Sequence, residues 1–116
     1  MKASLAQALA RLPGAPTATY PEGLPFATLM AGGSMSLEIY TPGSNTDGQD
    51  RQQPHAQDEL YFVQRGRSEL VIQGQRFAAE PGDAFFVAAG TEHRFENFTA
   101  DFATWVVFYG PPGGES

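Results

Sequence analysis

Apolar and polar positions alternate with a period of two along most of the chain, as in strands that bury one face. Within residues 34–40, for example, Met35, Leu37 and Ile39 alternate with more polar neighbours. Short strands at regular spacing, separated by turns, predict an antiparallel sandwich or barrel. The expected strands are residues 26–30, 34–40, 59–64, 69–73, 76–78, 84–87, 93–96 and 102–109.

The first residues have a helical period instead. Leu5, Leu9 and Leu12 recur on one helical face, and Ser4 precedes Gln7 at the spacing of a capping box. Pro13-Gly14 ends the pattern, so we predict a short amphipathic helix over residues 4–12. A helix this short is marginally stable alone and is expected to pack on the sheet.

The 116 residues correspond to one domain. We expect an N-terminal helix and extended connector over residues 1–25, a β-barrel over residues 26–110, and a flexible Gly/Pro-rich tail over residues 111–116. Gln7 and Arg11 interrupt the apolar stretch at the N-terminus, so we interpret it as mature protein rather than a signal peptide.

Charge and composition exclude several function classes. Seven basic and 13 acidic residues give a net charge of −6 without a basic cluster, which disfavours nucleic acid and anionic membranes as partners. The longest apolar run, residues 84–89, is too short to span a bilayer. The chain has no cysteine, which excludes disulfides and thiolate chemistry and agrees with a predicted cytoplasmic location. Dinucleotide, P-loop and serine-hydrolase motifs are also missing.

The two histidines, His55 and His93, are the strongest candidates for chemistry. His55 and Glu59 are four residues apart, so an extended backbone places both on one face. His93 belongs to another predicted strand and joins them only if the sheet closes. Two imidazoles and one carboxylate match the ligands of non-haem iron sites and also suit zinc, manganese or nickel. We therefore predict one divalent metal ion (Fe, Zn, Mn or Ni).

The spacing around these residues is regular. Glu59 is followed by six residues and Gly66, His55 lies four residues before Glu59, and Gln53 lies two residues before His55.

A second spacing surrounds His93. Gly82, Gly90, His93 and Asn97 are separated by seven, two and three residues, and Ala88 lies two residues before Gly90.

These spacings resemble the two motifs of the cupin superfamily, G-x5-H-x-H-x3,4-E-x6-G and G-x5-P-x-G-x2-H-x3-N, with alanine in place of the proline. The resemblance covers about residues 30–110. It implies a small single-domain protein of the conserved-barrel (cupin 2) type, with an all-β double-stranded β-helix or jelly-roll fold, commonly a homodimer. The family's usual metal set of three histidines and one glutamate maps onto Gln53, His55, Glu59 and His93.

Gln53 departs from the motif because it stands where a histidine is usual. An alternative register would place His55 first and Gln57 second, but it would need a carboxylate where Tyr61 and Phe62 stand. We therefore prefer Gln53 as the weaker fourth ligand. Its neutral amide would lower metal affinity or leave the position to water.

Alternation also predicts the pocket. If Glu59 faces inward, so do Tyr61 and Val63, and Phe95 follows His93. In the last strand alternation does not decide between the face with Trp105 and the face with Phe108. The predicted pocket residues are Tyr61, Val63, Phe95 and Trp105. This interior suits a small, partly apolar molecule with oxygen donors.

Several functions fit this interpretation. The first is a metal-dependent dioxygenase, since a two-histidine, one-carboxylate set leaves coordination positions open. The alternatives are a metal-dependent or metal-free isomerase or lyase, and a non-catalytic module that binds or senses a small ligand. Leu60 and Phe62 are predicted to face outward and are expected to pack under the N-terminal helix or against a second subunit.

Overall fold

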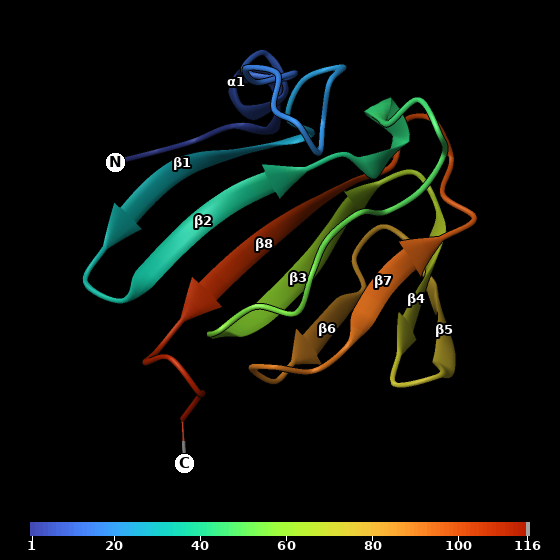
Figure 1. The fold of residues 1–116 in the computed structure, drawn as a ribbon. Helices are drawn as coiled ribbons and strands as arrows, with labels where there is room; N and C mark the ends of the chain where they lie inside the picture. Colours follow the sequence, from blue (N-terminus) through green and yellow to red (C-terminus); the bar gives the residue numbers. More distant parts are fainter. Residues whose placement is uncertain (116) are drawn as a thin grey trace.

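The computed structural model describes residues 1–115 and contains two antiparallel sheets (Figure 1). The five-stranded sheet has the order β1-β2-β8-β3-β6, and the three-stranded sheet has the order β5-β4-β7. The strands are β1 (Phe26–Gly32), β2 (Met35–Tyr40), β3 (Asp58–Arg65), β4 (Ser68–Ile72), β5 (Gln75–Ala79), β6 (Ala84–Val87), β7 (His93–Glu96) and β8 (Ala103–Tyr109). These elements confirm the predicted all-β jelly-roll barrel, and strand boundaries differ from the expected ones by at most two residues.

The N-terminal helix α1 spans Leu5–Leu9 and is shorter than predicted. The capping box is present, with Ser4 and Gln7 each accepting a hydrogen bond from the other's backbone N–H. After Leu9 the chain continues as a turn through Arg11, and Leu12 is kept out of the helix because the residue before a proline is disfavoured in the α conformation. A short 3-10 turn, η1 (Pro42–Ser44), follows β2.

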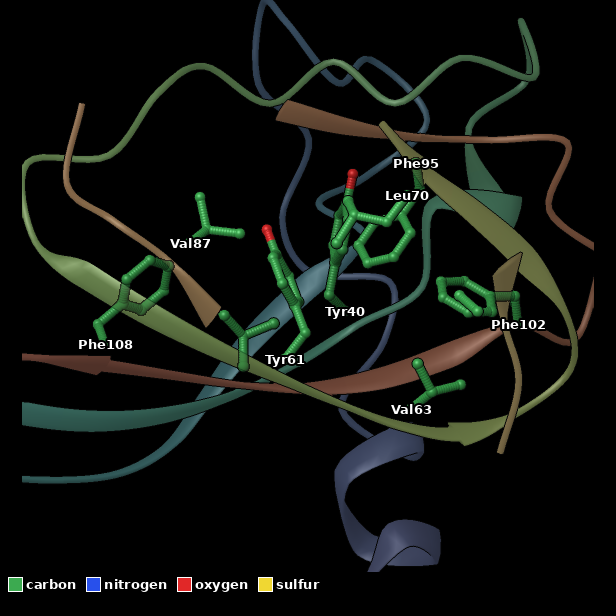
Figure 2. Packing of buried hydrophobic residues seen from close by; sticks show 10 residues of the cluster. Tyr40, Tyr61, Val63, Leu70, Val87, Phe95, Phe102 and Phe108 are labelled. Atoms are coloured by element: carbon green, nitrogen blue, oxygen red, sulfur yellow. The ribbon is translucent and has the colours of Figure 1, made fainter. Parts of the chain in front are cut away.

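Helix α1 covers the outer side of the five-stranded sheet. Ala8 is fully buried against Ile39 and Ala103, and Leu9 packs on the same cluster. Figure 2 shows the helix on the side of the sheet opposite the core residues. The helix does not cover Leu60 and Phe62, which are 42% and 46% exposed.

The main core lies between the two sheets (Figure 2). Tyr61 and Val63 of β3 are fully buried, and the Tyr61 ring packs edge-on against Phe95 of β7 at 4.9 Å. Phe95 in turn contacts Phe102 at a ring distance of 5.0 Å. The side chains of strand β3 therefore alternate as predicted, and the even-numbered residues Leu60 and Phe62 face outward.

The prediction that Trp105 lines the pocket is wrong. The buried core face of β8 carries Val106 and Phe108, whereas Trp105 packs with the helix cluster outside the barrel. Its indole Nε1 donates to Gln64 Oε1 at 3.1 Å. Alternation could not decide because α1 covers the outer face of β8, so both faces of this strand are apolar.

Gly66 ends β3 in a backbone conformation that only glycine adopts easily. Its φ is +73°, and a Cβ atom there would lie 2.5 Å from Phe102 Cα. The close approach explains why the spacing after Glu59 ends in glycine.

Within residues 1–115, no helix has the length and apolar character needed to cross a bilayer. The last described residues return to β3, where Gly113 donates to the Ala56 carbonyl and Glu115 donates to the Asp58 carboxylate. Of the expected flexible tail, Ser116 lies outside the described residues.

Candidate metal centre

The closed barrel brings together the three residues that the spacing singled out. One ligand atom from each of His55, Glu59 and His93 lies within 4.8 Å of the other two. His93 Nε2 is 2.7 Å from Glu59 Oε1, and His55 Nε2 is 3.9 Å from Glu59 Oε2. The group therefore spans the two sheets, because Glu59 is on β3 and His93 begins β7.

Backbone contacts hold His55 in place although it precedes β3. Its carbonyl accepts a hydrogen bond from the Gly90 N–H at 2.8 Å, which ties it to the turn before β7. Its ring packs edge-on against Phe108 at 4.7 Å. This hydrogen bond therefore fixes the segment that carries His55 relative to the turn that leads into His93.

Glu59 has an unpaired oxygen. Its side chain is 1% exposed, and Oε2 has no hydrogen-bond partner among the described residues. A buried carboxylate oxygen without a partner is costly. A cation about 2.1 Å from each ligand atom would place those atoms about 3–4 Å apart, close to the observed spacing. The residues present therefore fit a divalent cation, which would provide the missing partner.

Both histidines can present a lone pair. Burial lowers the pKa of His55, partly opposed by the charge of Glu59, so its imidazole is neutral at pH 7. His93 Nδ1 is 2.8 Å from the Thr91 carbonyl, to which it donates, and this leaves Nε2 for the centre.

His93 Nε2 lies within hydrogen-bond distance of Glu59 Oε1, so a proton on Nε2 would be donated to that oxygen. Burial lowers the pKa of His93, but the hydrogen bonds with Glu59 and the Thr91 carbonyl raise it by more, and the net shift is upward. A bound cation would displace the proton between Nε2 and Oε1, as metal binding at protonated ligands generally does.

The Tyr61 hydroxyl adjoins the group, 2.9 Å from His93 Nε2. Burial and the nearby charge of Glu59 raise the pKa of Tyr61 well above its usual value, so the phenol stays protonated. Its oxygen is also 2.8 Å from Gln52 Oε1, which accepts its hydrogen. Tyr61 was predicted from alternation, but its contact with the metal group was not.

The sequence reasoning missed Asp50, which anchors the loop over the barrel. Its carboxylate accepts hydrogen bonds from Gln52 Nε2 at 2.6 Å, from the Phe95 N–H at 2.7 Å and from the Tyr40 hydroxyl. Asp50 lies in a polar loop at an unspecified position of the first motif, so neither the motif nor a periodic signal could have identified it.

The structure does not bring Gln53 into the metal group. Its side chain is exposed and lines a separate groove that also contains His93. Residues 51–55 are not a regular strand, so the motif position of Gln53 does not fix the direction of its side chain. Among the described residues, it is the neighbouring Gln52 that is linked to the group, through Tyr61.

A cavity of about 280 Å³ lies beside the group, where His55 forms part of its wall. Tyr61, Val63 and Phe95 are buried in the core and do not line this cavity. Its lining includes the rings of Tyr20, Phe26, Tyr40 and Phe108, the Glu38 carboxylate and the Gln52 amide.

Glu38 is a second functional candidate that sequence reasoning missed. It is partly buried on β2, on the face that also carries Ser36 and Tyr40. Burial and the charge of Glu59 raise its pKa, partly opposed by a hydrogen bond with Thr28. The alternation in residues 34–40 placed Glu38 opposite the apolar positions, but the side that faces the interior could not be identified.

Comparison with known proteins agrees with this geometry. The family model described as Cupin domain matches residues 36–109. A functionally uncharacterized protein of Streptomyces coelicolor is 36% identical over 78 residues, 67% of this chain and 72% of the relative.

Solved structures share the fold at low identity. KdgF from Halomonas sp. has a TM-score of 0.62 at 18% identity over 74% of this chain and 77% of that chain. A Cupin 2 conserved barrel domain protein from Salinispora arenicola has a TM-score of 0.58 at 20% identity over 73% of this chain and 74% of that chain. The DMSP lyase DddQ from Ruegeria pomeroyi has a TM-score of 0.57 at 19% identity, and the match covers 73% of this chain and 46% of that chain.

Proposed function

Because the chain belongs to the Cupin_2 family of cupin domains, we propose that it is a metal-dependent protein that acts on a small molecule. His55, Glu59 and His93 would hold one divalent ion, and the adjoining cavity would hold the molecule. The observation that carries this proposal is the buried Glu59 Oε2, which has no hydrogen-bond partner within residues 1–115 and lies 3.9 Å from His55 Nε2.

The first candidate reaction is a dioxygenation. When bound, a divalent ion supplies Lewis-acid chemistry and, if it is iron, oxygen activation. His55, Glu59 and His93 would leave coordination positions of such an ion open. The aromatic wall beside His55 would position a partly apolar substrate and exclude water.

The second candidate is a lyase or isomerase reaction, favoured by the Tyr61 hydroxyl beside His93 Nε2. The phenol is buried and does not line the cavity, so it would act on a substrate only through His93, by exchanging a proton with Nε2. The fold accommodates such chemistry, since the DMSP lyase from Ruegeria pomeroyi shares it.

Metal analysis tests the proposal. We expect close to one equivalent of a divalent metal, measured by mass spectrometry, in protein purified without an affinity tag or chelator. Iron would favour the dioxygenase, to be followed by oxygen-uptake assays, whereas zinc, nickel or manganese would favour the lyase or isomerase. The metal-dependent function would be overturned if the purified protein contains no metal and binds none of Fe(II), Mn(II), Ni(II) or Zn(II) when these are added. The protein would then be interpreted as a module that binds a small ligand without metal.

We also propose that the outer face of β3 and β6 pairs with a second copy of the chain. Leu60 and Phe86 are direct cross-strand neighbours, and with Phe62 they are 42%, 63% and 46% exposed. Contiguous exposed apolar side chains of this kind mark interaction surfaces. Light scattering over a concentration series should show a dimer that Phe62→Glu converts to a monomer, whereas Phe77→Glu on the other sheet should not. A wild-type monomer throughout would contradict this.

A further inference from the structure

The cavity beside the metal group combines aromatic rings with a single acidic side chain. Tyr20, Phe26, Tyr40 and Phe108 contribute rings, and Glu38 contributes the carboxylate. Among the described residues that line it, none is a lysine or an arginine. Aromatic faces attract cations through the ring quadrupole, and a carboxylate adds a full negative charge.

Strand register places Glu38 at a defined distance from the metal group. Glu38 pairs with Val106 of β8, and Val106 pairs with Tyr61 of β3. Neighbouring strands lie about 4.8 Å apart, so the backbones at Glu38 and Tyr61 are about 10 Å apart. Glu59 faces the same interior one inward position along β3. A small molecule between these strands can therefore approach Glu38 and the metal group at the same time.

Glu38 has no positive partner within the described chain. No lysine, arginine or histidine of residues 1–115 forms an ion pair with it, although eight such pairs occur elsewhere. Burial and the charge of Glu59 raise its pKa, so its environment penalises an uncompensated negative charge. A cation bound beside Glu38 would remove this penalty.

We infer that the cavity binds the ammonium group of a small ligand between Glu38 and the aromatic rings, with an oxygen donor of the same ligand directed toward the metal group. The ligand class is a small amine or quaternary ammonium compound that carries a hydroxyl or carboxylate. The inference rests on the proposed metal-dependent function and specifies the substrate class of that site.

A basic side chain beside the Tyr20 ring does not oppose this assignment. The Arg51 guanidinium lies 5.3 Å from the Tyr20 ring centroid, but it is paired with Glu22 at 2.6 Å and Asp47 at 3.1 Å. Its positive charge is therefore offset by two carboxylates. An anionic ligand would find no basic partner in the cavity lining, and a neutral ligand would leave Glu38 uncompensated.

A pair of isosteric probes tests the inference. Choline carries a trimethylammonium group and a hydroxyl, and 3,3-dimethylbutan-1-ol has the same shape without the charge. Both fit a cavity of about 280 Å³. In calorimetric titrations of the purified protein at neutral pH, we expect choline to bind at least about tenfold more tightly than the neutral alcohol.

Substitutions locate the preference in the cavity. Glu38→Gln keeps the size of the side chain and should abolish the preference for choline, and Phe26→Leu should reduce it by removing one ring. Glu80→Gln removes an exposed carboxylate that does not line the cavity and should leave the preference unchanged. Thermal melting of each variant shows that it is folded.

The inference is overturned if the neutral alcohol binds as tightly as choline, if neither probe binds up to about 10 mM, or if Glu38→Gln retains the preference. Metal content measured on the same samples separates this result from the proposed function. Metal binding without a choline preference overturns the ammonium site alone. A choline preference in protein that cannot be loaded with metal overturns the metal centre alone.

Discussion

His93→Ala is expected to abolish stable binding of a divalent metal ion. Its Nε2 atom is 2.7 Å from Glu59 Oε1 and is held in place by the bond from Nδ1 to the Thr91 carbonyl. Losing a residue that merely orients a ligand costs about 10–100-fold in metal affinity. Losing the ligand itself should therefore cost more than about a hundredfold. Metal content after dialysis against a competing chelator measures the effect.

Glu59→Gln should have a comparable effect with less change of shape. It removes the negative charge and keeps the volume of a side chain that is 1% exposed. Arg94→Ala is the matched control, since Arg94 follows His93 directly but its side chain is 57% exposed and bonds to Glu96. If His93→Ala and Glu59→Gln both keep as much metal as Arg94→Ala, the assignment of these ligands is wrong.

The trio His55, Glu59 and His93 could be predicted because two independent sources of information agreed. The two motif spacings selected the three residues, and even spacing along an extended backbone pointed to the same side chains. His55 precedes β3, so its position depends on the Gly90 hydrogen bond and on packing against Phe108 rather than on strand alternation. Closure of the barrel then followed from the short, turn-separated strands, and the structure brings the three side chains within 4.8 Å.

The remaining site residues could not be predicted because alternation applies only within regular strands. Gln53 was selected by its position in the first motif, but it lies in an irregular segment with an exposed side chain, and Gln52 is the residue linked to Tyr61. The prediction that Trp105 lines the pocket was wrong for another reason. Helix α1 packs on the outer face of β8, so this face is as apolar as the inner one.

Glu38 shows a third limit of prediction from sequence alternation. Its strand alternates clearly, but the acidic side faces the interior and the apolar side faces the helix cluster. A sequence pattern that assigns apolar residues to the core therefore inverts this strand. The pattern is inverted because helix α1 packs on the outer face of the sheet, where Ile39 contacts Ala8.

Phe95→Ala is expected to lower the free energy of unfolding by about 3–5 kcal/mol. Phe95 is 1% exposed, and its ring packs against Tyr61 at 4.9 Å and Phe102 at 5.0 Å. It comes from β7 and contacts a residue of β3, so its ring joins the two sheets that carry His93 and Glu59. A domain of this size has a total stability of about 5–15 kcal/mol, so the loss is a large share. Urea unfolding followed by circular dichroism measures it.

Phe77→Ala provides the comparison, because Phe77 is the same residue type on β5 but is 41% exposed. It should lose clearly less stability than Phe95→Ala, since truncating a partly exposed ring leaves no closed cavity. Equal losses of unfolding free energy in the two variants would mean that the ring of Phe95 does not join the sheets.

If the loss of unfolding free energy is confined to Phe95→Ala, the packing that stabilises the barrel also positions the metal group, because Tyr61 contacts both Phe95 and His93. Metal affinity should then fall together with stability in Phe95→Ala and remain unchanged in Phe77→Ala.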